Sequence, residues 1–356
     1  MLKYPYHDKG WGQVDNHKIE EFAASIRFSG AVLLNDKDGN IVWEAAFGYS
    51  NRADRLPNQV GTRFGIASGC KLFTAIAICQ LIEEGKLSLD SKLSECLDIP
   101  LPDFSEEITV HHLLSHSSGI PDYYDEEVMD DFEDLWKAVP MYTFRNGTDF
   151  LPLFQNEGMK FQPGERFHYN NAGFVVLGLI VEQHAGMPFQ DYIEQRIFQP
   201  CEMLDSGYFS LDRLPANTAI GYIDEKDGTW RTNQYAIPVQ GYADGGAYVT
   251  APDMMKLWSS LLANKLLTPS MTRQLLIPHQ YDPGSGLHYG LGVWITKKDE
   301  DLFKYHVMGY DPGVNFRSAY YPATGHTLVV TSNGSGGAFE MMRLIEEELS
   351  KGSSST

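Results

Sequence analysis

A serine and a lysine three residues apart are the first residues in this chain whose types and spacing suggest chemistry. Ser68 and Lys71 lead into an apolar run, residues 75–82, which lacks proline and glycine and so predicts a buried helix. Ser68 then lies in the first turn, where unpaired N–H groups favour a developing anion, and Lys71 lies on the same face. The hydroxyl could be a nucleophile, with the lysine as its base if burial lowers the lysine pKa. The pair is also open to a structural interpretation, because short spacings recur by chance.

A tyrosine and two asparagines directly precede a second apolar helix, which the sequence predicts over residues 174–180. The asparagines, Asn170 and Asn171, could simply cap that helix. The functional interpretation instead places the phenol of Tyr169 and the amide of Asn171 at the edge of a pocket.

Two histidines and a cysteine have structural interpretations that we favour over chemical ones. His112 and His116 lie one helical turn apart, which is a possible zinc-ligand spacing, but no glutamate adjoins His112 and no third ligand stands out. We therefore expect no metal, and histidines that bond the backbone. Cys70 lies between Ser68 and Lys71 but on the other side of the helix, which favours core packing over a role as nucleophile.

Residues 122–136 are dense in carboxylates with aromatic residues between them. One interpretation is a solvated helix face with a few apolar anchors. The other is an acidic rim on a cleft, which would repel anionic ligands.

Composition and charge exclude several classes of function. The chain has 356 residues and a net charge of −19, which argues against nucleic-acid and anionic-lipid partners. Its cysteines show neither metal-ligand spacing nor the density of a disulfide scaffold. Neither a signal-peptide core nor a run long enough to span a bilayer is evident, so we expect a cytoplasmic protein, or a secreted one whose leader has been removed.

The order of elements predicts an α/β (α+β) fold whose antiparallel sheet is formed from both chain ends and flanked by helices. An N-terminal hairpin is expected around residues 36–40, and helices are expected over 17–28, 254–262 and 339–349. The C-terminal strands are expected over residues 291–296, 303–308, 316–321 and 327–331. The predicted domains are a discontinuous sheet lobe (1–75 plus 245–351), an inserted, mainly helical lobe (76–244) and a disordered tail (352–356).

Three segments together resemble the serine β-lactamase and penicillin-binding-protein superfamily, in particular its class C-like, D-peptidase and esterase branch. Ser68 and Lys71 look like the nucleophile motif, and Tyr169 with Asn171 is similar to a Tyr-x-Asn motif. Residues 108–120 and 244–253 resemble structural loops of the same branch. The matched segments occur in the expected order from about residue 28 to about residue 333, which chance explains poorly.

The third motif of that family, Lys-Thr-Gly or His-Thr-Gly on a strand lining the pocket, is altered. Aligning on Pro312 and Gly313 places residues 307–309 in the motif and leaves His306 one residue out of register. Because side chains alternate across a strand, His306 faces away from the pocket unless a bulge restores it. In the family, this strand helps to hold a substrate carboxylate.

The resemblance implies a serine hydrolase that forms an acyl-enzyme at Ser68 on a small ester, amide or D-amino-acid peptide, with no cofactor. Lys71 and Tyr169 would share proton transfer, and either could be the base. The residues expected to bind substrate are Asn171, His306, Gly309 and Tyr310. The alternative is a catalytically weak penicillin-binding-like protein that binds peptide or cell-wall fragments.

Overall fold

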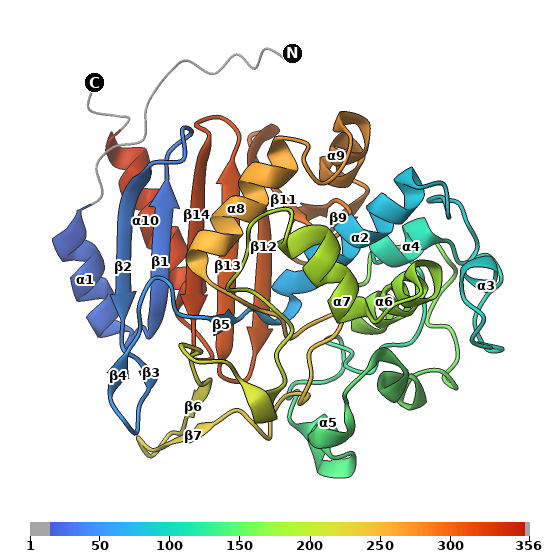
Figure 1. Ribbon diagram of the computed structural model, residues 1–356, viewed down its shortest axis with the longest axis horizontal. Helices are drawn as coiled ribbons and strands as arrows, with labels where there is room; N and C mark the ends of the chain where they lie inside the picture. Colours follow the sequence, from blue (N-terminus) through green and yellow to red (C-terminus); the bar gives the residue numbers. More distant parts are fainter. Residues whose placement is uncertain (1–14, 353–356) are drawn as a thin grey trace.

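The computed structural model describes residues 15–352, and its largest element is an eight-stranded antiparallel sheet built from both ends of the chain (Figure 1). This arrangement confirms the predicted fold class. In spatial order, the strands are β2 (Ile41–Phe47), β1 (Gly30–Asn35), β14 (His326–Ser332), β13 (Val314–Tyr321), β12 (Asp301–Asp311), β11 (Trp294–Lys298), β10 (Leu287–Tyr289) and β9 (Gln280–Asp282).

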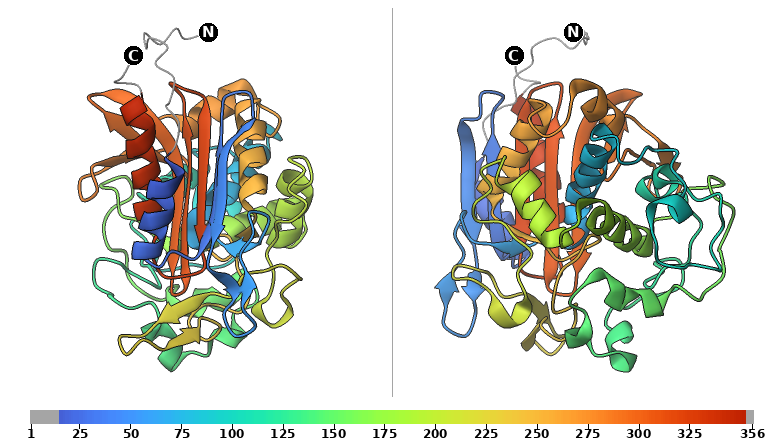
Figure 2. Two further views of the ribbon diagram at one scale, coloured as in Figure 1. Left: turned by 90° about the vertical axis from the view of Figure 1, so that its left-hand side faces the viewer. Right: turned by 45° about the vertical axis from the view of Figure 1, so that its right-hand side comes forward.

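Helices cover both faces of this sheet, which is why β1 is buried on both of its faces rather than on alternate residues. All residues of β1 before its last are buried. On one face, α1 (Asn16–Ser25) and α10 (Ala338–Gly352) lie side by side, as the left panel of Figure 2 shows. On the other face lie α8 (Ala251–Leu262) and α2 (Lys71–Glu83), which share the main hydrophobic core with the sheet.

The helical layer beside the sheet is built around two helices that are apolar on nearly all sides. Helix α2 packs against α6 (Asn171–Ala185), and the two belong to one buried cluster. Such all-round apolar helices are typical of a protein core. In the described part of the chain, no single helix has both the length and the apolar character to cross a membrane; only a pair bent by 76°, Asn171–Ala185 with Phe189–Phe198, meets those criteria jointly, and most of α6 is buried in the protein.

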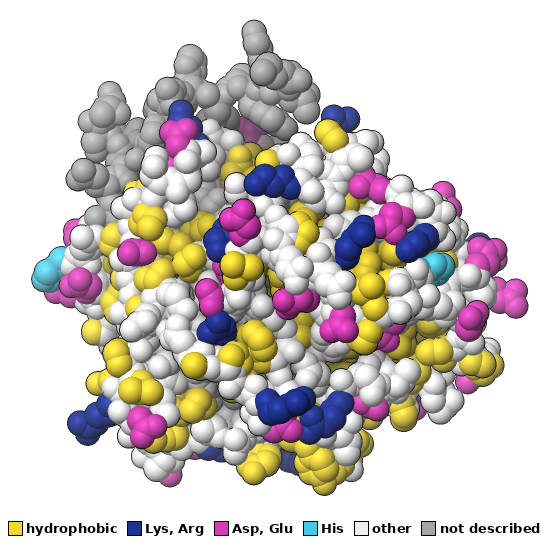
Figure 3. All heavy atoms as spheres, in the orientation of Figure 1, with side chains coloured by type: hydrophobic (Ala, Val, Ile, Leu, Met, Phe, Trp, Pro, Cys, Tyr) yellow, Lys and Arg dark blue, Asp and Glu magenta, His cyan; other side chains and the backbone are white. Residues whose placement is uncertain are grey.

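Surface charge on the face drawn in Figure 3 is mixed, with acidic and basic side chains interspersed among small apolar patches. The acidic side chains on this face therefore do not form one continuous negatively charged patch.

Several elements differ from the sequence-based expectation. The helix interpretation of residues 122–136 is wrong for most of that stretch, which forms turns before the short helix α5 (Asp134–Ala138). Strands β9 and β10 were not predicted, because three-residue strands leave little periodic pattern. The proposed domain division stays a prediction, although its boundary at 75/76 falls within α2. Of the predicted tail, residue 352 ends α10 and 353–356 lie outside the described residues.

Trp258 of α8 connects that helix to the middle of the sheet, and we expect its removal to destabilise the folded protein. Its side chain is fully buried, and its indole Nε1 donates a hydrogen bond to Ser318 Oγ of β13 at 2.8 Å. We expect Trp258→Ala to lower the free energy of unfolding by about 3–5 kcal/mol, measured by urea denaturation.

The matched control is Trp230→Ala, because Trp230 is 42% exposed; its cost should be about 1 kcal/mol or less. An equal decrease in the free energy of unfolding in the two variants would contradict a stabilising role for the buried Trp258 side chain.

Candidate active site

Ser68 lies in a tight turn that leads straight into the core helix. The 3-10 turn Ala67–Cys70 is followed directly by α2, whose first residue is Lys71. Ala67 adopts a φ of 45°, a left-handed conformation that is uncommon for a residue with a Cβ and tends to occur at functional turns. The nucleophile is thus held at a sharp bend at the helix start, close to the position that the sequence predicts.

The Lys71 amino group is buried and makes three hydrogen bonds. Its Nζ lies 2.9 Å from Ser68 Oγ, 2.8 Å from Asn171 Oδ1 and 2.7 Å from the backbone carbonyl oxygen of Asp244. Burial lowers the pKa of Lys71, while the nearby acidic groups, with Asp244 foremost, oppose that shift. The structure therefore brings three segments that are far apart in sequence to one nitrogen.

Asn171 is oriented toward Lys71 by the half-buried carboxylate of Asp122. Asp122 accepts hydrogen bonds from the backbone N–H of Asn171 at 2.7 Å and of Ala172 at 3.0 Å, at the start of α6. It also accepts from Asn171 Nδ2 at 3.3 Å, which leaves Oδ1 facing Lys71. Burial raises the pKa of Asp122 to about 7, and the backbone hydrogen bonds oppose that rise. The neighbouring Asn170 takes the structural role, because its side chain caps α6 by accepting from Gly173 N–H at 2.6 Å.

Tyr169 lies beside the Ser68 hydroxyl, in an aromatic wall. Burial raises the pKa of Tyr169 well above its ordinary value; the charge of Glu126 adds to the rise, and a hydrogen bond with Ser68 opposes it. Its ring stacks on Trp294 with centroids 6.0 Å apart and lies 5.0 Å from Lys71 Nζ. The phenol is thus held in its protonated form next to a lysine whose pKa is lowered.

Strand β12 passes directly against the turn that carries Ser68. A Cβ at Gly309 would lie 1.9 Å from the carbonyl oxygen of Ile66 and 3.0 Å from the backbone nitrogen of Gly69. Only glycine permits this approach, which brings the following residue, Tyr310, to the same cavity as Ser68.

A cavity of about 620 Å³ opens over Ser68, between the sheet and the helical layer. Of the residues that the sequence singled out, the cavity wall contains Ser68, Tyr169, Asn171, Gly309 and Tyr310. It also contains part of the acidic stretch 122–136, so the interpretation of that stretch as an acidic rim on a cleft is confirmed for Glu126 and Asp130.

Three residues of the site were missed as functional candidates. Trp294, on β11, belongs to no motif, and its contact with Tyr169 joins two segments that are far apart in the sequence. Asp122 was noted only as one of many carboxylates. Asp244 belongs to a recognised loop, but nothing in the sequence indicates that its carbonyl oxygen accepts from Lys71.

The histidines and Cys70 have the structural roles expected of them. Nδ1 of His112 accepts from the backbone of Thr109, and Nδ1 of His116 accepts from the backbone of Asn170. Cys70 is fully buried, and burial raises the pKa of its thiol to about 12, which disfavours the reactive thiolate.

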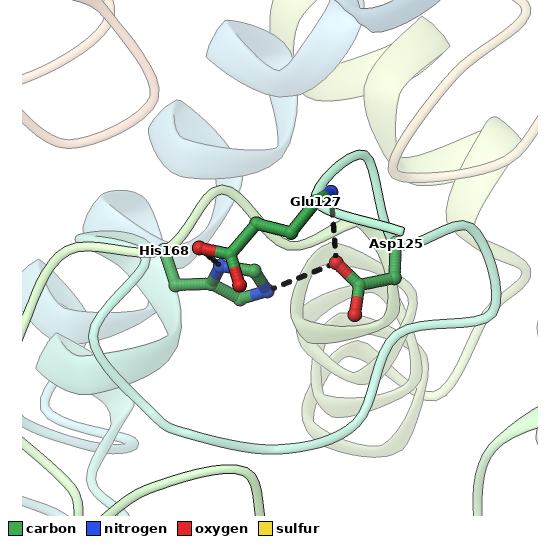
Figure 4. Close-up of side chains that lie close together, drawn as sticks. All are labelled: Asp125, Glu127 and His168. Atoms are coloured by element: carbon green, nitrogen blue, oxygen red, sulfur yellow. Dashed lines mark hydrogen bonds and ion pairs between the residues drawn. The ribbon is translucent and has the colours of Figure 1, made fainter. Parts of the chain in front are cut away.

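One group of residues next to the site has the composition of a cation site. Ligand atoms of Asp125, Glu127 and His168 lie within 4.8 Å of one another, as Figure 4 shows. The Lys160 ammonium already pairs with Asp125 and lies 2.8 Å from His168 Nε2. Because a lysine supplies the positive charge, we interpret the group as an ion-paired clamp between two loops rather than a metal centre.

Comparison with known proteins agrees with this geometry. Residues 16–351 match the family described as Beta-lactamase. The chain belongs to this family. A crystal structure of a penicillin-binding protein from Bacillus halodurans is 55% identical, covers 92% of this chain and 99% of its own, and superimposes with a TM-score of 0.88. An octameric penicillin-binding protein homologue from Pyrococcus abyssi is 28% identical over 95% of this chain and 78% of its own, with a TM-score of 0.84.

A D-aminopeptidase from Cereibacter sphaeroides is also similar, with 29% identity over 276 residues. The match covers 75% of this chain and 50% of the D-aminopeptidase. The resemblance inferred from the sequence motifs is thereby confirmed at the level of the family.

Within this Beta-lactamase-family chain, the altered third motif has a clear structural outcome. Strands β12 and β13 pair in continuous register from Tyr305 to Asp311, so no bulge turns His306 toward the cavity. The His306 side chain is buried, lies 3.0 Å from Thr296 Oγ1 and is not part of the cavity wall. The structure therefore does not bring His306 to the other predicted substrate-binding residues. Val307, in the position of the family's cation, is buried in the core.

The close approach at Gly309 predicts a position that tolerates no side chain. In Gly309→Ala, the added methyl group must push β12 away from the Ser68 turn, since the atoms it meets belong to the backbone. We expect the free energy of unfolding to fall by about 1–3 kcal/mol, in the range of overpacked cores. We also expect kcat/KM for an activated ester to fall about 100-fold, because small misplacements of reacting groups are costly.

Gly158→Ala is the matched control, since a Cβ at Gly158 would meet nothing within 4 Å. Wild-type melting temperature and activity in Gly309→Ala would show that this contact does not set the position of β12.

Proposed function

We propose that this protein is a serine hydrolase that forms an acyl-enzyme at Ser68 and acts on small amides, esters or D-amino-acid peptides. The observation that carries the proposal is the set of contacts around Lys71 Nζ. Ser68 Oγ, Asn171 Oδ1 and the Asp244 carbonyl oxygen are all within hydrogen-bond distance of it.

These contacts suggest where the lone pair of a neutral Lys71 amino group would point. The amide oxygen of Asn171 and the carbonyl oxygen of Asp244 can only accept hydrogen bonds. When Lys71 is neutral, its two N–H groups therefore serve these two acceptors, and its lone pair is left facing the Ser68 hydroxyl. Burial makes this neutral form more accessible by lowering the lysine pKa. Lys71 is thus the base that takes the Ser68 proton as Oγ attacks the substrate carbonyl carbon.

Tyr169 is suited to the opposite role. Its pKa lies well above the ordinary value for a phenol, so the phenolate needed for a base is rare near neutral pH. The protonated phenol can instead donate to the departing nitrogen or oxygen when the tetrahedral intermediate collapses. Lys71, which is now an ammonium, stabilises the transient phenolate of Tyr169 and then returns a proton to it.

Backbone amides complete the proposed mechanism. The N–H groups of Ser68 and Tyr310 are the proposed oxyanion hole, because β12 packs on the Ser68 turn through Gly309. Donors of this kind each contribute about 10²–10³ in rate. Water then hydrolyses the Ser68 ester and frees the enzyme.

The substrate class draws support from the relatives and from β12. The similar protein from Cereibacter sphaeroides is named a D-aminopeptidase. Val307 stands where a cation would hold a carboxylate, and His306 lies outside the cavity wall. We therefore expect weak recognition of penicillins, whose carboxylate would lack this partner. The same feature is what favours the second candidate, a catalytically weak peptide-binding protein.

Ser68→Ala should abolish acylation, because within residues 15–352 Ser68 is the only hydroxyl or thiol that is hydrogen-bonded to Lys71 Nζ. We expect a fluorophosphonate to label wild-type Ser68, as shown by mass spectrometry of the labelled peptide, and to leave Ser68→Ala unlabelled. Turnover of p-nitrophenyl butyrate should be lost in parallel.

Ser94→Ala serves as the control for this test, since Ser94 is exposed on a different helix. Full ester turnover by Ser68→Ala contradicts the mechanism. If neither the fluorophosphonate nor a labelled penicillin reacts with the wild type, the weak-binding alternative is favoured.

The roles of Lys71 and Tyr169 can be separated by the leaving group. Tyr169→Phe should lower kcat/KM about 10²–10⁴-fold for D-phenylalanine p-nitroanilide, whose leaving nitrogen needs a proton. It should affect p-nitrophenyl butyrate much less, because p-nitrophenolate leaves without one. Lys71→Met should slow both substrates.

The reverse pattern, with Tyr169→Phe slowing both substrates and Lys71→Met only the anilide, would exchange the two roles. Thermal unfolding of both variants checks that each is folded.

A further inference from the structure

The cavity over Ser68 has one part whose wall is uncharged. Residue 150 and the segments 209–211 and 237–242 contribute no charged side chain to the cavity wall. This part, which we call the apolar compartment, is lined by Phe150, Leu211, Ile237 and Val239, together with Tyr123. Leu211 is half-buried and the other four are buried. Such a wall favours an apolar ligand, because a polar group would lose its hydrogen bonds to water there.

Tyr123 connects the apolar compartment to the nucleophile. Its hydroxyl donates to the carboxylate of Asp244, and the backbone carbonyl of Asp244 accepts from Lys71 Nζ, which is bonded to Ser68 Oγ. The Tyr123 ring also packs against Phe150, with centroids 5.4 Å apart. A chain attached to the carbonyl carbon that Ser68 attacks can therefore enter the compartment past Tyr123.

Backbone hydrogen bonds hold the wall of the compartment in place. The N–H of Leu211 donates to the carbonyl oxygen of Val239 at 2.8 Å, and the N–H of Val239 donates to that of Met141 at 3.2 Å. The Phe144 ring packs on Phe150, with centroids 4.9 Å apart. Three separate segments of the chain thus brace one another, so that binding an apolar chain requires little reordering of the protein.

The charged residues of the cavity wall come from other segments. Apart from Asp244, which Tyr123 binds, they are Glu126 and Asp130 in the turns before α5, and Asp282, Asp311 and Arg317 in strands β9, β12 and β13. An uncharged substrate needs a counter-charge from neither group. Apolar contact in the compartment can therefore select such a substrate without help from these residues.

Two separate aromatic walls indicate on which side of the scissile bond the compartment lies. Tyr169, the proposed proton donor to the leaving group, stacks on Trp294. Trp294 and the residues around it form an apolar cluster that is distinct from the one containing Tyr123 and Phe150. The leaving group lies beside Tyr169, so the compartment is on the acyl side.

We propose that the apolar compartment binds the acyl chain of an uncharged ester, so that Ser68 accepts a medium-length apolar acyl group in preference to acetyl. This inference rests on the proposed function, because it names the acyl group transferred at the same site. Ser68 Oγ forms the new ester bond as the alcohol leaves with the proton from Tyr169, and water then releases the carboxylic acid. A cavity of about 620 Å³ is large enough for such a chain.

The first test varies the acyl chain while the leaving group stays constant. For p-nitrophenyl acetate, butyrate and hexanoate, kcat/KM of the wild type should rise about two- to fourfold per added methylene group, as expected when each methylene is transferred out of water. A series that is flat, or that falls from acetate to hexanoate, overturns the inference.

The second test places the same chain on either side of the ester bond. Ethyl hexanoate and hexyl acetate are isomers, and their hydrolysis can be followed by titrating the acid released at constant pH. We expect ethyl hexanoate to have the higher kcat/KM, because its long chain is on the acyl side. Equal values, or a preference for hexyl acetate, contradict the assignment of the compartment to the acyl chain.

The third test narrows the compartment. In Leu211→Trp, the hexanoate-to-acetate ratio of kcat/KM for the p-nitrophenyl esters should fall about 4- to 16-fold, the equivalent of two methylene groups. Because the ratio is taken within one preparation, it does not depend on how much of the protein is folded. Leu214→Trp is the matched control, since Leu214 is also half-buried but lies outside the cavity wall; its ratio should equal that of the wild type.

An unchanged ratio in Leu211→Trp, or an equal fall in Leu214→Trp, overturns the assignment of the acyl chain to this compartment. The proposed function fails separately. It is overturned if the wild type shows no Ser68-dependent hydrolysis of any of these esters, whereas Ser68-dependent turnover of the acetate without a preference for the hexanoate overturns only the present inference.

Discussion

The burial of the Lys71 amino group is the constraint on which the rest of the site depends. A buried ammonium is unfavourable unless its hydrogen bonds are made. Here three acceptors, from three separate segments of the chain, meet at one nitrogen. The core between α2, α6 and the sheet excludes water from this point, and the same exclusion lowers the lysine pKa toward the range in which it can act as a base.

The surrounding elements can be understood as supports for those contacts. Asp122 caps the start of α6 and turns Asn171 toward the lysine. The Tyr123 hydroxyl donates to the side chain of Asp244, whose backbone carbonyl accepts from Lys71. On the opposite wall, β12 comes within backbone contact of the Ser68 turn because residue 309 is glycine. Changes that move any of these supports should act on chemistry through the position of Ser68.

The residues of β12 distinguish this member of the Beta-lactamase family from one that anchors a carboxylate on the corresponding strand. Val307 is buried in the core, and His306 is bonded to Thr296. Glu126, Asp130 and Asp311 also line the cavity. A scaffold can thus keep the residues around its nucleophile while the opposite wall of the cavity changes, because the nucleophile and that wall come from different elements.

The sequence by itself indicated the family, through the resemblance of its motifs, and the two-ended sheet, through the order of its apolar segments. It also indicated Ser68 as the candidate nucleophile, with Lys71 and Tyr169 as candidates for proton transfer, because these residues lie within short motifs. It could not determine the partners of those residues. The contact of Trp294 with Tyr169 joins distant segments, and the direction of His306 away from the cavity follows from the unbroken register of β12 with β13. Only the tertiary structure decided which carboxylates of the acidic stretch are paired and which face the cavity, since adjacent residues such as Asp125 and Glu126 differ only in what the fold places beside them.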